Sequence, residues 1–208
     1  TNCCVSYVDF LQDVEPAFPV HSFSIPQKGK EGSPLTQDTL PSFCYLFDDQ
    51  ESKNPDFHLP WAEGRDYAVG FFAKDRGALR PSRLVESAKS WLCHGAVDQK
   101  EKILPFVLED NSKRISSVEA TSRYLLHIKE SWNKVIGKND PLKEFEQQEI
   151  ILTVPASFDE RARMLTVEAA KIVGYRNLTL LEEPQAAFYH WISRINIPLQ
   201  AGQTIVVC

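Results

Sequence analysis

Two adjacent carboxylates are the first residues in this sequence whose type and position could do chemistry. Glu182 and Glu183 follow the short apolar segment 178–181 and directly precede Pro184. Carboxylates at the end of a strand commonly hold a metal ion or orient a water molecule. They could equally be helix N-terminal charges, which the helix dipole favours, and composition alone supports that alternative. The residues themselves leave both roles open.

A lysine is the second candidate. Lys89 lies in segment 82–93, just off a stripe of apolar residues at helical spacing that consists of Leu84, Val85, Ala88, Trp91 and Leu92. Spacing alone favours a solvated lysine on a helix over this segment. The sequence contains no nucleophile triad, no zinc signature and no Walker-type phosphate loop. It therefore offers a cation and an acidic pair without any of these motifs.

The elements that must position the acidic pair begin with an apolar, β-branched run at 150–154. This run predicts a buried strand, which Pro155 ends because proline cannot donate a ladder hydrogen bond. Ser157 and Glu160 have the spacing of a capping box and predict the start of a helix. Gly174 lies where a left-handed helix stop is expected.

That helix should bury one apolar face, formed by Ala162, Leu165, Ala169, Ile172 and Val173. A second short strand at 178–181 follows, and Pro184 suits the first turn of another helix. Strand, helix, strand and helix within forty residues indicate an α/β unit. Its polar residues gather at the carboxyl ends of the strands, where such folds place ligands.

The longest predicted helix covers 116–138. Ser116 and Glu119 form a second capping box there, and the apolar stripe consists of Val118, Leu125, Ile128, Trp132 and Val135. Shorter strands are predicted within segments 2–10, 18–25, 39–47 and 67–70, and a short helix at 71–76. The polar, turn-rich segments 26–34 and 48–63 predict exposed loops.

Composition bounds the class of protein. The 208 residues are 43% hydrophobic and 25% charged, which is ordinary for a soluble globular chain of one or two domains. The net charge of −5 argues against a nucleic-acid or anionic-membrane surface. No apolar run approaches the roughly 18 residues that span a bilayer.

The cysteines and the chain ends suggest a context. Five cysteines without C-x-x-C spacing argue against a disulfide framework or a zinc site and favour a reducing cytoplasm. The five histidines are too scattered to suggest a metal site. Thr1 leads straight into an apolar stretch, and residues 204–208 (TIVVC) have the pattern of a buried strand that is cut midway. We therefore expect a fragment of a longer chain.

Residues 153–163 and 169–187, TVPASFDERAR and AAKIVGYRNLTLLEEPQAA, resemble the strongest signature of the heat-shock-seventy (DnaK-type) chaperones. That signature is TVPAYF followed by an arginine, and later NEPTAAA. Residues 1–5 (TNCCV) resemble the tail of the family's first phosphate loop. Further pieces follow in the family's order at 39–42, 68–73, 87–90 and 204–208. The match is strong over 150–187 and weaker, but in order, elsewhere.

The resemblance implies lobe I of an actin-like, ribonuclease-H-like ATPase domain, with a mixed sheet flanked by helices. A core subdomain would contain residues 1 to about 37 and about 118 to 202. A smaller α/β subdomain, about 38–117, would be inserted into it, and 203–208 would begin lobe II. ATP or ADP, Mg²⁺ and, as a further candidate, K⁺ are the implied ligands. In such domains the protein mainly positions the reactants and stabilises charge during hydrolysis of the γ-phosphate.

The resemblance also assigns roles to individual residues. Thr1, Asn2 and Cys3 match the end of the first phosphate loop, with Cys3 at a position that varies in the family. Lys89 matches the lysine that reaches the γ-phosphate and the attacking water, where a cation offsets the developing charge. Glu183 matches the glutamate that organises water around the metal ion, a task suited to a hydrogen-bond acceptor.

Two further positions match a relay, and several depart from the family pattern. Pro155 and Arg163 match the proline and arginine that connect ATP to the peptide-binding domain; a strand terminator and a solvated helix arginine are the alternatives. Glu182 replaces the family's asparagine, which adds a charge that could strengthen ion binding or raise one pKa. The family's threonine is lost at Gln185, and bulky Phe188 stands where alanine packs.

The expected function is that of a divergent DnaK-like chaperone ATPase, which would hydrolyse ATP to drive conformational cycling on client polypeptides. Clients and co-chaperones would bind parts of the protein outside this chain, and the isolated fragment should be inactive. The alternatives are an inactive nucleotide-sensing or partner-binding module on the same fold, or a small-molecule kinase of the actin-like superfold. Sugar kinases usually lack both the TVPA segment at 153–156 and the Glu-Pro pair.

Overall fold

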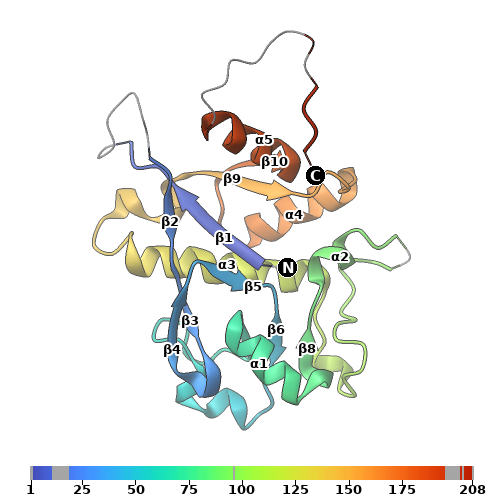
Figure 1. Ribbon diagram of the computed structural model, residues 1–208. Helices are drawn as coiled ribbons and strands as arrows, with labels where there is room; N and C mark the ends of the chain where they lie inside the picture. Colours follow the sequence, from blue (N-terminus) through green and yellow to red (C-terminus); the bar gives the residue numbers. More distant parts are fainter. Residues whose placement is uncertain (1, 11–18, 96, 195–201, 203, 208) are drawn as a thin grey trace.

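The computed structural model describes residues 2–10, 19–95, 97–194, 202 and 204–207. Over these residues the chain is a mixed α/β structure with two three-stranded and two two-stranded sheets (Figure 1). The mixed α/β class is the one that the sequence predicts. No helix within these ranges is long and apolar enough to cross a membrane.

The predicted α/β unit is present, and we call it the parallel unit. Its elements are β9 (Glu149–Val154), α4 (Glu160–Ile172), β10 (Asn177–Glu182) and α5 (Glu183–Arg194). The two strands are parallel, and their pairing runs from Asn177 opposite Glu149 to Glu182 opposite Val154. Two parallel strands joined by a helix are the arrangement that the alternating sequence pattern predicts.

The start of α4 corrects the predicted capping box. Asp159, not Ser157, caps the helix, and its Oδ1 accepts a hydrogen bond from the Ala162 amide at 2.8 Å. The physical reason is a turn before the helix, in which the Phe158 amide donates to the Pro155 carbonyl. That turn moves the helix start two residues along the chain. At the other end, Gly174 has the positive φ of 87° expected of a left-handed stop.

The buried face of α4 also differs from the prediction at one position. Ala162, Leu165, Ala169 and Val173 are buried as predicted, whereas Ile172 is 63% exposed. The buried face continues through Thr166 and Ala170 instead. These six residues follow spacings of three and four, which places Ile172 outside the stripe.

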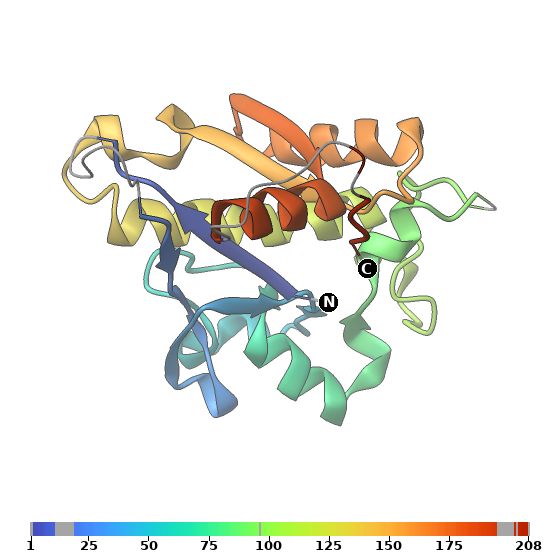
Figure 2. The same ribbon diagram turned by 45° about the horizontal axis from the view of Figure 1, so that its top comes forward.

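The long helix α3 (Ser117–Val135) confirms its predicted start, because the Ser116 hydroxyl accepts from the Glu119 amide at 3.0 Å. The Glu119 carboxylate pairs with Arg123 at 2.8 Å. Four of the five stripe residues are buried, but Val135, in the last turn, is 50% exposed and that assignment was wrong. Figures 1 and 2 show α3 crossing the middle of the molecule.

The N-terminal strand β1 (Asn2–Tyr7) is slightly shorter than the predicted segment 2–10. It pairs antiparallel with β2 (His21–Phe23) through its second half and with β5 (Thr39–Pro41) through its first half. Cys3, Val5 and Tyr7 point toward the core, since alternate residues of β1 are half-buried. The predicted strands at both ends of this sheet are therefore confirmed in outline.

Residues 25–85 form what we call the antiparallel region. Its strands are short: β3 (Ile25–Lys28), β4 (Pro34–Gln37), β6 (Cys44–Leu46), β7 (Tyr67–Val69) and β8 (Leu84–Val85). The predicted exposed loop at 26–34 is largely a β3–β4 hairpin, which corrects that expectation. One of its polar side chains, Gln27, is only 2% exposed, whereas residues 30, 31, 33 and 34 are exposed as predicted.

Gln27 shows how the antiparallel region starts its helix α1 (Phe71–Leu79). Its side-chain oxygen accepts from the Phe71 amide at 2.9 Å, and its side-chain nitrogen donates to the Thr39 carbonyl. Gly70, just before the helix, has φ of 81°. A Cβ on Gly70 would lie 2.6 Å from the Gln27 oxygen, so only glycine fits this close approach.

The predicted exposed loop at 48–63 also contains buried groups. Glu51 is 6% exposed and accepts from the Tyr45 hydroxyl and from Nε of Arg76 at 2.9 Å. Arg80 lies 3.3 Å from the same carboxylate. The segment folds around this buried carboxylate through two short 3₁₀ turns, so the expectation of a surface loop was wrong for Glu51.

The predicted helix at 82–93 is split in two. Leu84 and Val85 form strand β8 against β6, and only Ala88–Leu92 form the helix α2. Ser87 separates them with a left-handed φ of 56°, which breaks the helical run before Lys89. The first two residues of the predicted stripe therefore belong to a strand, in which Leu84 is half-buried and Val85 is buried.

One hydrophobic core joins these parts. It extends from Phe23 and Leu46 through the inner face of α3 to Leu165 and Ala169 on α4. The inner faces of β9 and β10 pack against the same core. In Figures 1 and 2, α5 lies on the other side of these strands from α3 and α4. The outer face of α5 remains accessible, since none of its residues is buried.

Candidate functional site

The carboxyl ends of β9 and β10 create the site. Because the strands are parallel and in register, Val154 lies opposite Glu182. The residues that follow, Pro155 and Glu183, therefore begin their connections at the same edge of the sheet. Glu183 is the first residue of α5, so its position is also favourable to the helix dipole.

Lys89 and Glu183 form an ion pair across this edge. They are 94 residues apart in the sequence, and α2 carries the lysine to the start of α5. Both side chains remain accessible, at 36% and 45% exposure. The structure thus brings together the two residues to which the family resemblance assigns catalytic roles, in an arrangement that solvent and a ligand can reach.

Glu182 has a different partner. Its carboxylate accepts from the Arg163 guanidinium at 2.6 Å, and both side chains are about one-third exposed. Arg163 lies in the first turn of α4, and its Nε also donates to the Phe158 carbonyl at 3.1 Å. The two adjacent carboxylates are therefore engaged by two separate cations.

Phe158 connects the two ion pairs. Its carbonyl holds Arg163, and Nζ of Lys89 lies 6.0 Å from the centre of its ring. Lys89, Glu183, Glu182, Arg163 and Phe158 thus form a closed circuit of contacts, which we call the contact ring. Sequence reasoning named four of its members individually but missed Phe158, although this residue occupies the last position of the TVPASF segment that carries the resemblance.

Asn2, Cys3 and Pro155, the other predicted residues that the structure describes, are not members of this ring. Asn2 is exposed on β1, and Cys3 is half-buried beside it, with its Sγ 3.6 Å from the Ser42 hydroxyl. Burial raises the pKa of the Cys3 thiol, opposed by the Ser42 hydrogen bond and the charge of Lys89. Thr1 lies outside the described residues. Pro155 is half-buried at the end of β9, as a strand terminator should be.

A second thiol was not singled out from the sequence. Cys93 lies one helical turn after Lys89, is exposed, and its Sγ is 3.9 Å from the Lys89 carbonyl. Partial burial raises the pKa of the Cys93 thiol, with the charge of Asp159 acting in the same direction. Its spacing of four from Lys89 was the available signal, because residues four apart share one face of a helix.

The donor set limits how a metal ion could bind. Within the described ranges, no three His, Cys, Asp or Glu side chains gather closely enough to form a metal site of their own. A Mg²⁺ ion beside Glu183 would need oxygen ligands from water and from phosphates, which is how Mg²⁺ commonly binds at nucleotide sites. A carboxylate next to an accessible cation fits that chemistry.

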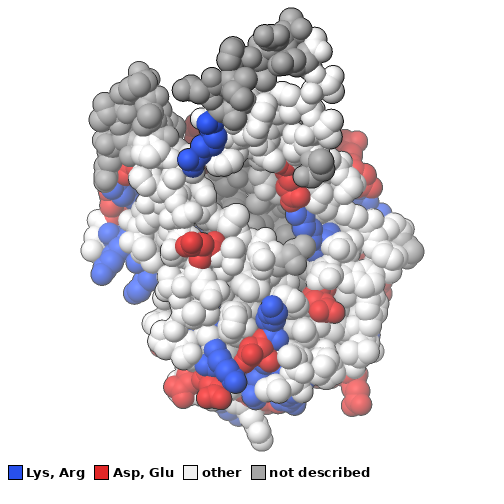
Figure 3. Space-filling model, viewed as in Figure 1, with Lys and Arg blue, Asp and Glu red and all other residues white. Residues whose placement is uncertain are grey.

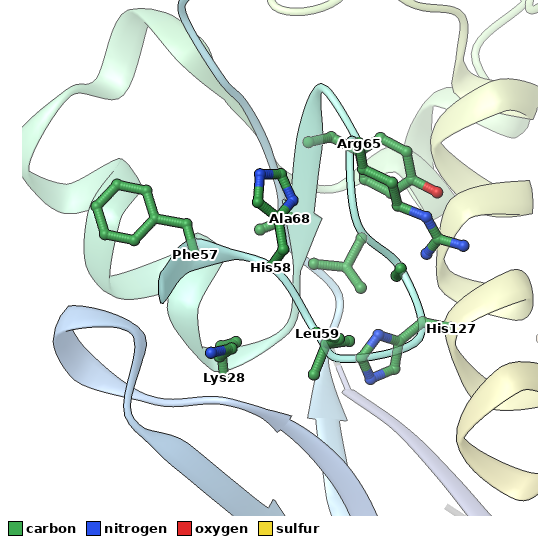
Figure 4. Close-up of a pocket in the computed structure, with 10 residues that line it drawn as sticks. Lys28, Phe57, His58, Leu59, Arg65, Ala68 and His127 are labelled. Carbon is green, nitrogen blue, oxygen red and sulfur yellow. The ribbon is translucent and has the colours of Figure 1, made fainter. Parts of the chain in front are cut away.

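Two cavities lie away from the contact ring. A groove of about 520 Å³ follows α3 and the end of α4, lined among others by Leu126, Lys129 and Ile172. A small, partly open space of about 20 Å³, large enough for one water molecule, lies beside His58, Arg65 and His127 (Figure 4). On the face shown in Figure 3, Lys and Arg are interspersed with Asp and Glu. Neither cavity includes Lys89 or Glu183.

Comparison with known proteins gives a consistent family. The chain is 30% identical over 129 residues to a Chaperone protein HscA homolog of Aeromonas salmonicida, covering 57% of this chain and 20% of that protein. It is 30% identical over 154 residues to the corresponding protein of Actinobacillus pleuropneumoniae, covering 68% and 24%. It is 26% identical over 142 residues to the Chaperone protein DnaK of Prochlorococcus marinus, covering 62% and 21%. No family model matches the chain.

These relatives are all chaperones by name, and the chain matches only a fifth to a quarter of their length. The similarity is distributed over more than half of the chain, and identity stays near 30%. The comparisons therefore support a common origin with considerable divergence.

Proposed function

Since this chain is a divergent member of the Hsp70 chaperone family, we propose that it forms lobe I of an actin-like ATPase domain. In the full-length protein this lobe would bind ATP with Mg²⁺ and hydrolyse it to drive conformational cycling on client polypeptides. The observation that carries the proposal is the ion pair between Lys89 and Glu183. The core and inserted subdomains would be residues 1–37 with 118–202, and residues 38–117.

The geometry supports separate tasks for the two charged groups. Lys89 supplies a cation that can offset negative charge on phosphate oxygens. Glu183 supplies a carboxylate that can accept hydrogen bonds from metal-bound water. Each neutralises the other in the absence of ligand, so a bound nucleotide would replace one favourable contact by two. Mg²⁺ itself would neutralise phosphate charge when bound.

The test uses the full-length protein, because the relatives are much longer than this chain. ATP turnover should fall by roughly 10²- to 10³-fold in Lys89→Ala and in Glu183→Ala, as when comparable electrostatic groups are removed from other enzymes. Lys100→Met is the matched control, because this lysine pairs with Glu168 on the outer surface and should leave turnover unchanged. Unchanged turnover in both site variants would overturn the assignment.

A module that binds nucleotide without hydrolysing it is the second candidate. The direct contact between Lys89 and Glu183 favours it, because a persistent pair would keep the two charged groups bound to each other instead of to phosphate and metal-bound water. Calorimetric titration of the full-length protein with ATP, combined with a turnover assay, separates the two candidates. Binding without turnover supports the sensing module, and turnover supports the ATPase. We further propose a cytoplasmic location. We also propose polypeptide partners, which pull-down with unfolded model clients would test.

A further inference from the structure

The contact ring contains one residue that the proposed mechanism does not use. Glu182 lies directly beside Glu183, yet its carboxylate turns to Arg163 rather than to Lys89. The resemblance places an asparagine at this position, so the negative charge is a distinctive feature of this chain. A second carboxylate next to Glu183 would either join the ion site or have to be neutralised.

The geometry favours neutralisation. The Arg163–Glu182 distance of 2.6 Å is that of a strong charge-assisted hydrogen bond. Arg163 cannot swing freely, because its Nε is also held by the Phe158 carbonyl. Glu182 is thereby tied to a cation whose own position is fixed by the turn before α4.

The position of Glu182 in the fold allows the Arg163–Glu182 pair to influence the orientation of Glu183. Glu182 is the last residue of β10, and Glu183 is the first residue of α5. Arg163 belongs to α4, which follows the neighbouring strand β9. The pair therefore bridges the starts of two helices that leave the same sheet edge, at the place where the direction of the Glu183 side chain is decided.

We propose that Glu182 is a positioning residue of the nucleotide site. By pairing with Arg163 it withdraws its own charge from the ion site and fixes the β10–α5 junction, so that Glu183 faces Lys89. This inference rests on the proposed function, since it assigns Glu182 a role in the same site. The two adjacent carboxylates then have different roles: Glu183 faces the ligand, and Glu182 fixes the β10–α5 junction.

The experiment measures how much Mg²⁺ full-length protein needs for half-maximal ATP binding. Glu182→Gln and Arg163→Met should each raise that concentration roughly tenfold, the scale seen when groups that orient metal ligands are removed. The double variant should be no worse than either single one, because both changes break the same contact. Arg163→Lys, which keeps the charge, should recover most of the loss.

The control and the contrary results are equally specific. Glu168→Gln removes a carboxylate from the same helix as Arg163, where it pairs with exposed Lys100, and should leave the Mg²⁺ requirement unchanged. A higher requirement in Glu182→Gln but not in Arg163→Met would show that Glu182 binds the ion, and would overturn the proposal. Multiplying effects in the double variant would overturn it too.

A second measurement keeps this inference distinct from the proposed function. Urea unfolding is measured without nucleotide for the wild type, Glu182→Gln, Arg163→Met and the double variant. It reports whether Arg163 and Glu182 are energetically coupled at all. Loss of that coupling, with ATP binding intact, would overturn the inference alone. Absence of ATP binding in the wild type would overturn the proposed function, and the nucleotide role of Glu182 with it.

Discussion

The parallel unit and the antiparallel region are built on different physical principles. In the parallel unit, the buried residues of α4 are apolar except Thr166, and regular spacing places them against the core. In the antiparallel region, strands of two to four residues are held by buried polar groups such as Gln27 and Glu51. Both regions bury apolar side chains, and the antiparallel region adds specific hydrogen bonds made by buried polar groups.

The difference has a practical consequence for the two sides of the candidate site. Glu183 belongs to the parallel unit, whereas Lys89 follows directly on the antiparallel region. A change in solvent that weakens ionic contacts should therefore destabilise the surroundings of Lys89 before those of Glu183. Substitutions of opposite kinds in the two regions make this comparison testable.

The largest effect is expected from Leu165→Ala in α4. Leu165 is 6% exposed, and its loss should leave a cavity in the core that lowers the free energy of unfolding by about 3 kcal/mol. Met164→Ala, next to it and 65% exposed, is the control and should change stability by less than ~0.5 kcal/mol. Urea unfolding measures both. Equal effects would contradict the predicted inner face of α4.

His127 tests the junction of the two regions through pH. Burial lowers the pKa of His127 to about 4, from an ordinary 6.5, although its ring nitrogen contacts the Pro26 carbonyl at 3.0 Å. The unfolded chain takes up a proton below pH 6.5 and the folded chain does not until pH 4. Stability from this group is therefore complete above pH 6.5 and lost as pH falls toward 4, by about 3 kcal/mol in total.

The measurement is urea unfolding at pH 7 and pH 5 for wild type and His127→Gln. Wild type should lose about 2 kcal/mol more than the variant over this interval, because 1.5 pH units correspond to about that energy. The carboxylates titrate in both proteins and cancel in the comparison. An identical pH dependence in the two proteins would show that His127 can be protonated in the folded state.

The buried carboxylate of the antiparallel region should show a smaller effect that depends on salt. Glu51→Gln leaves Arg76 without its counter-ion, whereas Arg80 keeps its ion pair with Asp48 at 2.6 Å, and the expected cost is about 2 kcal/mol. The cost is below that of a fully buried pair because the two arginines are 32% and 43% exposed. Burial and the charge of Glu51 also raise the pKa of Tyr45 to about 12.

Salt separates this substitution from the one in α4. In about 1 M salt the effect of Glu51→Gln should shrink, because ionic contacts at this exposure are screened. The effect of Leu165→Ala should persist. Asp49→Asn, which removes an exposed partner of Lys113, serves as the control with little expected change. If both regions responded alike to salt, the proposed difference between them would be wrong.

The smallest predicted effect concerns Ser87. Its φ of 56° is costly for a residue with a side chain, and glycine would remove that strain while making the unfolded chain more flexible. We expect Ser87→Gly to raise the free energy of unfolding by roughly 0.5 kcal/mol. The midpoint of urea unfolding measures this. A lower midpoint would mean that the Ser87 side chain makes a contribution that outweighs the strain.

How far the fold could be predicted follows the same division. Apolar spacing correctly predicted β9, α4, β10 and α3, because burial of one face repeats along each element. It failed at Ile172, which lies outside the buried stripe of α4, and the predicted capping box failed at Ser157, because a turn moves the helix start to Asp159. Segments 26–34 and 48–63 were predicted as exposed loops because polar residues are mostly exposed in proteins. The burial of Gln27 and Glu51 could not be read from their residue types.

The site was predictable only with the family resemblance. Composition favoured a solvated Lys89 and a helix-terminal Glu183, and spacing could not show that they meet across 94 residues. The motif supplied both residues, and the structure brings them together. The family motif could not predict the Arg163–Glu182 pair, because the carboxylate of Glu182 departs from the family pattern.

The long helix α3 makes the two regions dependent on each other. Trp132 contacts Tyr7 and Phe23 from the N-terminal sheet, and His127 contacts Pro26, while the same helix packs on α4. Loss of either region would expose one flank of α3 and weaken the other. The chain should therefore unfold in a single cooperative transition, with the amides of α3 the slowest to exchange with deuterium.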